Sequence, residues 1–114
     1  MHSQQAMLAN ISMALAVQGL TPADRVLAVL PLLLVGGLCI QVLPALAVGA
    51  AVQLHPRFEA AAWLQAVATW RPSTSLLVPA ATQAVLAQPG WAAADLASLR
   101  CPSPRWARCK NRCW

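Results

Sequence analysis

The chain has 114 residues, enough for one compact domain that buries roughly two-thirds of the surface its unfolded form exposes. Its composition is 59% hydrophobic and only 10% charged, which is unusual for a domain that meets water on most of its outside. The composition therefore indicates a surface that is covered by a bilayer, by a partner or by the rest of a larger protein.

The net charge of +5 is concentrated at the end of the chain. Up to residue 99 the positive and negative charges cancel, as Arg25, Arg57 and Arg71 stand against Asp24, Glu59 and Asp95. The rest contains no acid but carries Arg100, Arg105, Arg108, Lys110 and Arg112. Because the charge lies in one short segment, it does not indicate a basic binding face on the body. We predict two segments: a body over residues 1–100 and a basic tail over residues 101–114.

The first half of the chain predicts helices and strands in alternation. Apolar residues recur at helical spacing through residues 4–18, and Gly19 follows where a C-cap would lie, so we expect an amphipathic helix there. Residues 26–30 form a short apolar run stopped by Pro31, which suits a strand buried on both faces. Residues 38–48, after Gly36 and Gly37, are apolar on every side and are compatible with a buried helix despite Pro44.

The second half continues the alternation. Residues 51–54 predict a second strand, and the loop after it ends at Glu59, where an acid suits a helix start. The next helix stops before Pro72, residues 75–78 predict a third strand, and residues 79–88 predict a last helix. One face of the helix that begins after Glu59 collects apolar residues: Ala60, Trp63, Leu64 and Val67. This order predicts an α/β fold with a mostly parallel sheet, flanking helices and right-handed crossovers.

A membrane span is the alternative interpretation of the uncharged run. Residues 26–54 contain no charged residue and are long enough to cross a bilayer. Against a span, no cluster of Lys or Arg flanks the run closely, and helix-breaking residues divide it: Pro31, Gly36, Gly37, Pro44 and Gly49. The second functional hypothesis is therefore a small membrane-associated protein with a basic C-terminal tail.

The phrases MLAN, TPADRVLAVLPL, VGGL, LPALAVGAAVQLHPRFE, LLVPA and ADLASLR, read in order, resemble the middle of the adenylate-forming acyl-CoA synthetases, the AMP-dependent synthetase/ligase family. The likeness covers nearly all of residues 1–100. The resemblance implies part of the N-terminal, AMP-binding domain, which lies after the phosphate-binding loop of the family. In the family this stretch supplies strands and helices beside the acyl and nucleotide pockets.

The resemblance also implies a two-step reaction of a carboxylic acid with ATP, Mg²⁺ and CoA. The sequence contains no Ser/Thr/Gly-rich loop before His2, no Tyr-Gly-x-Thr-Glu motif and no lysine that matches the catalytic one of the family, since its only lysine is Lys110. We therefore predict that the chain holds no catalytic, cofactor-binding or metal-binding residues and is inactive alone. Its N-terminus lacks a secretory signal pattern, so we expect a cytoplasmic location.

The matched region also departs from the family in particular places. Leu33 and Leu34 stand where many relatives carry an aromatic residue and a histidine, and a leucine cannot hydrogen-bond a carboxylate or a phosphate. Gln4 follows Ser3 where relatives often have a histidine. The tail CPSPRWARCKNRCW replaces an expected glycine-rich loop, so we interpret it as disordered or as the product of a shifted reading frame.

Two binding hypotheses for the tail are weaker than the interpretation of the tail as an unstructured segment. Cys101, Cys109 and Cys113 lack the close pair and the histidine of a zinc site. Cations alternate with tryptophans in a pattern that can grip phosphates and stack on bases, but no scaffold displays them: Arg105, Trp106, Arg108, Lys110, Arg112 and Trp114. We expect no nucleic-acid partner.

Several residues in the body invite a functional interpretation, and each has a structural alternative. His55 lies in a turn where binding residues occur, but a surface histidine in a structural connection is the default. Tryptophans at helical spacing or beside Pro-Gly are more often packing anchors than pocket walls, which applies to Trp63, Trp70 and Trp91. Gly36 and Gly37 lack the rest of a phosphate loop, so close packing is the better explanation for them.

Overall fold

A small parallel sheet lies at the centre of the computed structural model, which describes residues 3–100. The strands are β1 (Arg25–Ala28), β2 (Ala51–Leu54) and β3 (Thr74–Ser75), in the order β2-β1-β3. Both neighbours of β1 run parallel to it, with Val26 opposite Val52 and Thr74. The predicted α/β class with a parallel sheet is confirmed.

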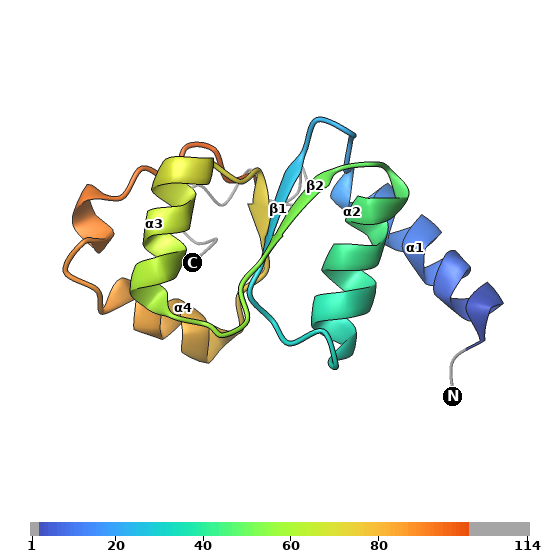
Figure 1. Ribbon diagram of the computed structural model, residues 1–114, viewed down its shortest axis with the longest axis horizontal. Helices are drawn as coiled ribbons and strands as arrows, with labels where there is room; N and C mark the ends of the chain where they lie inside the picture. Colours follow the sequence, from blue (N-terminus) through green and yellow to red (C-terminus); the bar gives the residue numbers. More distant parts are fainter. Residues whose placement is uncertain (1–2, 101–114) are drawn as a thin grey trace.

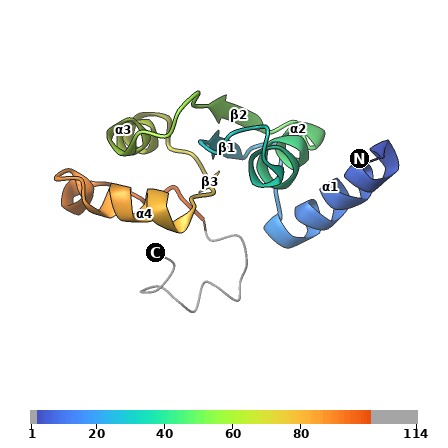
Figure 2. The ribbon, with the colours of Figure 1, turned by 90° about the horizontal axis from the view of Figure 1, so that it is seen from below.

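Helices cover both faces of the sheet, as Figures 1 and 2 show. The chain passes from β1 to β2 in one direction and from β2 to β3 in the other, so right-handed crossovers place their helices on opposite faces. The helix pair α3 and α4 lies on one side of the sheet, α2 on the other, and α1 farther out beyond α2 (Figure 1). The helical segments are α1 (Gln4–Gln18), the π-helix η1 (Gly36–Val42), α2 (Leu43–Ala47), α3 (Ala60–Trp70), α4 (Pro79–Leu86) and the short 3₁₀-helix η2 (Trp91–Ala93).

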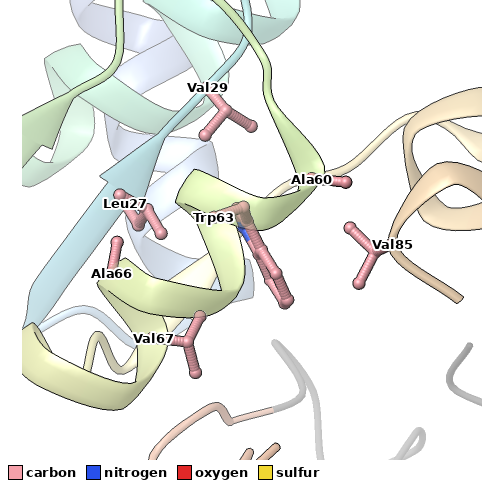
Figure 3. Packing of buried hydrophobic residues seen from close by; sticks show 7 residues of the cluster. All are labelled: Leu27, Val29, Ala60, Trp63, Ala66, Val67 and Val85. Atoms are coloured by element: carbon pink, nitrogen blue, oxygen red, sulfur yellow. The ribbon is translucent and has the colours of Figure 1, made fainter. Parts of the chain in front are cut away.

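The main apolar core lies between the sheet and the α3–α4 pair (Figure 3). Its central side chain is Trp63 of α3, which is 0% exposed and donates a hydrogen bond from Nε1 to Ser75 Oγ at 3.1 Å. That hydroxyl in turn donates to the carbonyl of Leu27 at 2.9 Å, so the buried indole is tied to both β3 and β1. Trp70 and Trp91 pack against the same cluster. The interpretation of these tryptophans as packing anchors is confirmed.

A second, smaller core lies on the other face of the sheet. It contains Leu20, Val26, Ala45 and Ala50, with partly buried residues of α1 and β2 around it. Val26 and Leu27 are adjacent in β1 and belong to different cores, because successive side chains of a strand point to opposite faces. The strand is thus buried on both faces, as the continuous apolar run predicted.

Helix α1 has the predicted bounds, but it is not amphipathic. Ser3 caps its start by accepting the N–H of Ala6 at 3.2 Å, and Gly19 ends it with a left-handed φ of 60°. The side of α1 that packs on η1 and α2 is only half-buried. Leu8 and Val17 are 64% and 66% exposed, and they project in opposite directions because they lie nine positions apart in the helix. The exposed apolar residues therefore do not gather on one face of the helix.

Two other predictions need correction. The third strand comprises residues 74–75 instead of 75–78, because β1 ends at Ala28 and leaves little for the third strand to pair with before α4 begins. The predicted buried helix over 38–48 is a π-helix that continues into α2, and it is not buried on every side, since Ile40 and Leu46 are exposed.

The uncharged run over residues 26–54 does not form one helix. It contains β1, η1, α2 and β2, separated by loops. Within residues 3–100, no helix is both long enough and apolar enough to cross a membrane.

Candidate functional site

The sheet order defines where a ligand would lie. All three strands point the same way, so their carboxyl ends share one edge. The connection after β1 leads to β2 on one side of β1, whereas β3 lies on the other side of β1. In open parallel sheets, ligands bind outside the carboxyl ends of strands where the order reverses in this way. The candidate site is therefore the carboxyl edge beside β1 and β3.

The chain segments at this edge are mostly aliphatic. Residues 29–35 follow β1 and include Leu33, which is 87% exposed, while Leu76 and Val78 follow β3 and are also exposed. Aliphatic side chains can cover an apolar ligand but cannot neutralise a phosphate or a carboxylate. This edge can therefore form a wall for the apolar part of a ligand.

The loop after β1 is held in place by a close contact with η1. A Cβ atom on Gly37 would lie 2.5 Å from the carbonyl oxygen of Pro31 and 2.8 Å from that of Leu30. No side chain fits there, so the packing role predicted for this glycine is confirmed. Gly36 differs, because a Cβ atom there would meet only the side chain of Leu30 at 3.5 Å.

The polar groups at the carboxyl edge come mainly from the connection after β2. His55 is half-buried, its N–H donates to the carbonyl of Ala28 at 2.9 Å, and its Nε2 lies 3.3 Å from the amide Nε2 of Gln53. The main-chain bond extends the β1–β2 pairing by one residue, which confirms the structural role of this connection. Arg57 and Glu59 follow it and are exposed.

The buried acid of the fold lies at the opposite, amino edge. Asp24, just before β1, accepts hydrogen bonds from the N–H of Thr21 at 2.8 Å and its hydroxyl at 3.2 Å, and forms an ion pair with Arg100. Burial raises the pKa of Asp24, but the bonds from Thr21 and Ser73 and the charge of Arg100 outweigh it and lower the pKa. The Arg100 N–H also donates to the carbonyl of Ser73 at 2.7 Å. This network closes the amino edge and holds residue 100 to the sheet.

Three amide side chains in and beside η1 belong to no motif that would mark them in the sequence. Asn10 and Gln18 of α1 donate to the carbonyls of Cys39 at 2.9 Å and Ile40 at 2.7 Å. Gln41 is only 3% exposed, and neither its Nε2 nor its Oε1 has a hydrogen-bond partner. Its sequence signal is a lone amide inside the apolar run LCIQVL. A buried amide without partners costs free energy of folding, so Gln41 lowers the stability of the fold.

The part of the chain that the structure describes contains no group of three or more His, Cys, Asp or Glu side chains that could hold a metal ion. Cys39 is free and half-buried. Cys101, Cys109 and Cys113, and the cations and tryptophans of the tail, lie outside the described residues. The absence of catalytic and cofactor-binding residues stays a prediction.

Comparison with known proteins finds AMP-binding enzymes and enzymes that join acids to CoA. The family model for AMP-binding enzymes matches residues 1–103. The chain is 44% identical over 98 residues to an indoleacetate–CoA ligase of Aromatoleum aromaticum, which covers 86% of this chain and 19% of that enzyme. It is 40% identical over 77 residues to a feruloyl-CoA synthase of an Amycolatopsis species, covering 68% of this chain and 16% of that protein. The chain thus spans less than a fifth of the length of these relatives.

Solved structures agree with this assignment. The N-terminal domain of FACL13 from Mycobacterium tuberculosis superposes with a TM-score of 0.81 at 22% identity, over 87% of this chain and 25% of that one, which shows the fold. The amide bond synthetase McbA from Marinactinospora thermotolerans superposes with a TM-score of 0.72 at 31% identity, over 87% of this chain and 20% of that one. The chain belongs to the AMP-binding enzyme family and corresponds to part of its N-terminal domain.

Proposed function

We propose that this chain supplies one wall of the substrate site in an ATP-dependent CoA ligase that acts on an aromatic carboxylic acid. The observation that carries the proposal is the 44% identity to the indoleacetate–CoA ligase, together with similarity to a feruloyl-CoA synthase and a 4-coumarate–CoA ligase. Each of these names describes an aromatic acid joined to CoA. The aliphatic carboxyl edge beside β1 and β3 suits the apolar ring of such an acid.

The proposed reaction has two steps. A carboxylate oxygen of the acid attacks the α-phosphorus of ATP, so that a new P–O bond forms and pyrophosphate leaves. The sulfur of CoA then attacks the acyl carbon, so that a thioester forms and AMP leaves. In both steps the aliphatic edge excludes water and holds the ring. It does not neutralise the phosphates, because its side chains carry no charge.

The groups that neutralise the phosphates come from other parts of the ligase. Negative charge on the phosphates requires backbone N–H donors, a cation or a metal ion. The described residues offer no cluster for Mg²⁺, and the sequence lacks the phosphate-binding loop, the Tyr-Gly-x-Thr-Glu motif and a matching lysine. We therefore propose that ATP, Mg²⁺ and CoA are bound by other parts of the ligase, in a cytoplasmic location, and that the 114-residue chain has no ligase activity alone.

A complementation assay tests the proposal. The full chain is co-expressed with the A. aromaticum indoleacetate–CoA ligase in which a short Gly/Ser linker replaces the 98 matching residues. The readout is pyrophosphate–ATP exchange that depends on added indoleacetate. We expect exchange from the co-expressed pair and none from either polypeptide alone.

Other outcomes refute specific parts of the proposal. Exchange by the chain alone would contradict the claim that it lacks the charged machinery. An associated pair that shows no exchange with indoleacetate, ferulate or 4-coumarate would remove the assignment of the carboxyl edge as a substrate wall. A Leu33→Asp variant places a charge in that wall, and we expect it to raise the KM for the acid more than the KM for ATP.

A further inference from the structure

The helical segment that follows the loop after β1 contains a proline. Pro44 is the second residue of α2, but η1 leads into α2 without a break, so the proline lies inside a continuous helical segment. Its partner in an α-helix would be the carbonyl of Ile40, and its partner in a π-helix would be the carbonyl of Cys39. Because proline has no N–H, it can donate to neither carbonyl.

The hydrogen bonds of η1 follow the π-helical pattern at this point. The N–H of Leu43 donates to the carbonyl of Leu38 and passes over the carbonyl of Cys39, which would be its partner in an α-helix. In an α-helix the ring of Pro44 would also clash with the Ile40 carbonyl. The wider turn of the π-helix relieves this clash, so the proline explains why this rare helix occurs here.

Helix α1 supplies donors for both carbonyls that Pro44 cannot serve. The amide nitrogen of Asn10 donates to the Cys39 carbonyl at 2.9 Å, and the amide nitrogen of Gln18 donates to the Ile40 carbonyl at 2.7 Å. Both amide side chains are half-buried, and α1 packs on η1 and α2 along this side. Two side chains of α1 thus compensate for the N–H that one proline lacks.

The first turn of η1 is in contact with the loop that forms the proposed substrate wall. Gly37 lies so close to the carbonyls of Leu30 and Pro31 that no side chain fits between them. The N–H of Leu34 donates to the Pro31 carbonyl, and the N–H of Leu38 donates to the Leu34 carbonyl, each at 3.1 Å. A change from π-helical to α-helical bonding would turn this first turn relative to α2 and move the loop with it.

We infer that Asn10 and Gln18 are positioning residues of the substrate wall, because they hold η1 in the π-helical pattern that Pro44 imposes and thereby place the loop after β1. This inference rests on the proposed function, in which that loop contacts the ring of the acid. The buried amide of Gln41 destabilises the same helix, which makes support from α1 more important.

A double-mutant cycle in the full 114-residue chain tests the compensation without any enzyme assay. The amide variant, Asn10→Leu/Gln18→Leu, removes both donors, and Pro44→Ala restores an N–H at residue 44. We expect the amide variant to lower the urea midpoint by about 1 M in the unchanged background. In the Pro44→Ala background we expect less than about half of this loss, since both carbonyls can then accept backbone N–H groups in an α-helix. Asn10→Leu alone replaces the amide variant in the cycle if the double substitution prevents folding.

Hydrogen exchange in the same chain measures whether the loop stays in place. The N–H groups of Leu34 and Leu38 are bonded in the loop and in the first turn of η1. We expect them to exchange at least about tenfold faster in the amide variant, because the local structure opens more often. The control Gln5→Leu/Ser12→Leu changes two exposed polar residues of the same helix. We expect it to change neither the hydrogen exchange of the loop nor the urea midpoint in the direction of lower stability.

Kinetics of the complemented indoleacetate–CoA ligase test the positioning role. We expect the amide variant to raise the KM for indoleacetate roughly fivefold, with little change in the KM for ATP, because a displaced wall loses contact with the ring alone. Pro44→Ala should raise the same KM without lowering the urea midpoint, since it alters the bonding pattern of η1 while completing its hydrogen bonds. A merely structural role of these residues does not predict this separation of KM from stability.

The outcomes distinguish this inference from the proposed function. A smaller midpoint loss in the Pro44→Ala background, together with faster hydrogen exchange of the loop, supports the positioning of the loop by the two amides even if the complemented pair shows no ligase activity. That lack of activity would refute the proposed function alone. Equal midpoint losses in both backgrounds, unchanged hydrogen exchange at Leu34 and Leu38, or an active pair whose KM for indoleacetate is the same in every variant overturns the inference.

Discussion

The contact between η1 and the loop after β1 predicts opposite effects for two adjacent glycines. In Gly37→Ala the new methyl would lie 2.5 Å and 2.8 Å from two carbonyl oxygens, and these backbone atoms cannot rotate away as a side chain can. Overpacking of this kind costs about 2–3 kcal/mol, and the better helix propensity of alanine returns up to about 1 kcal/mol. We expect a net loss of about 1–2 kcal/mol in the free energy of unfolding.

Gly36→Ala is the control for this substitution. Its methyl would meet only Leu30 Cδ1 at 3.5 Å, so it keeps the gain in propensity without the strain. The difference between the two variants isolates the strain and should be about 2–3 kcal/mol, which separates their urea midpoints by roughly 1–2 M in a chain of this size. Unfolding is followed by tryptophan fluorescence, since Trp63 is fully buried. Equal midpoints for the two variants would refute the close approach of η1 to Pro31.

Two further predictions concern buried polar groups. Gln41→Leu removes an amide whose two polar atoms have no partner, so we expect about 1–2 kcal/mol of added stability in thermal unfolding. Gln18→Leu is its control and should lose up to about 1 kcal/mol, since it breaks the bond to Ile40; destabilisation by Gln41→Leu would show that the buried amide has a partner. Asp24→Asn should lower stability at pH 7 by about 1–3 kcal/mol. Because folding lowers the pKa of Asp24 below its ordinary value of 3.8, its carboxylate stabilises the fold above that pH and stops doing so as the pH falls through the lowered pKa. The difference between the unchanged chain and Asp24→Asn should therefore shrink in urea titrations between pH 5 and pH 2, and a constant difference would contradict the role of the charge.

Local signals in the sequence predict the helix bounds well. The bounds of α1 follow from Ser3 and Gly19, and α3 begins after Glu59 and ends before Pro72. Caps and helix breakers act within a few residues, so they can be read without the tertiary structure. The sequence also predicts the strand 51–54 with its observed bounds.

Strand length and helix burial depend on partners that the sequence does not show. The third strand is short because β1 offers it little to pair with, and residues 76–78 form an apolar run typical of a buried strand whether or not a partner exists. Similarly, the apolar pattern of residues 38–48 does not tell which side of the helix faces the sheet. The candidate site had no motif at all, because it is defined by the order of the strands, which is a property of the assembled sheet.

The sequence by itself determined the α/β class, most of the helix bounds and the family, because each of these is recorded in local patterns or in the order of short phrases. Only the tertiary structure decided that Gln41 is buried without a partner, that Asp24 and Arg100 meet across the fold, and that α1 leaves large apolar residues such as Leu8 and Val17 exposed. These three features arise from contacts between segments that are distant in the sequence. Such contacts depend on how the helices pack on the sheet, and no local pattern encodes that packing.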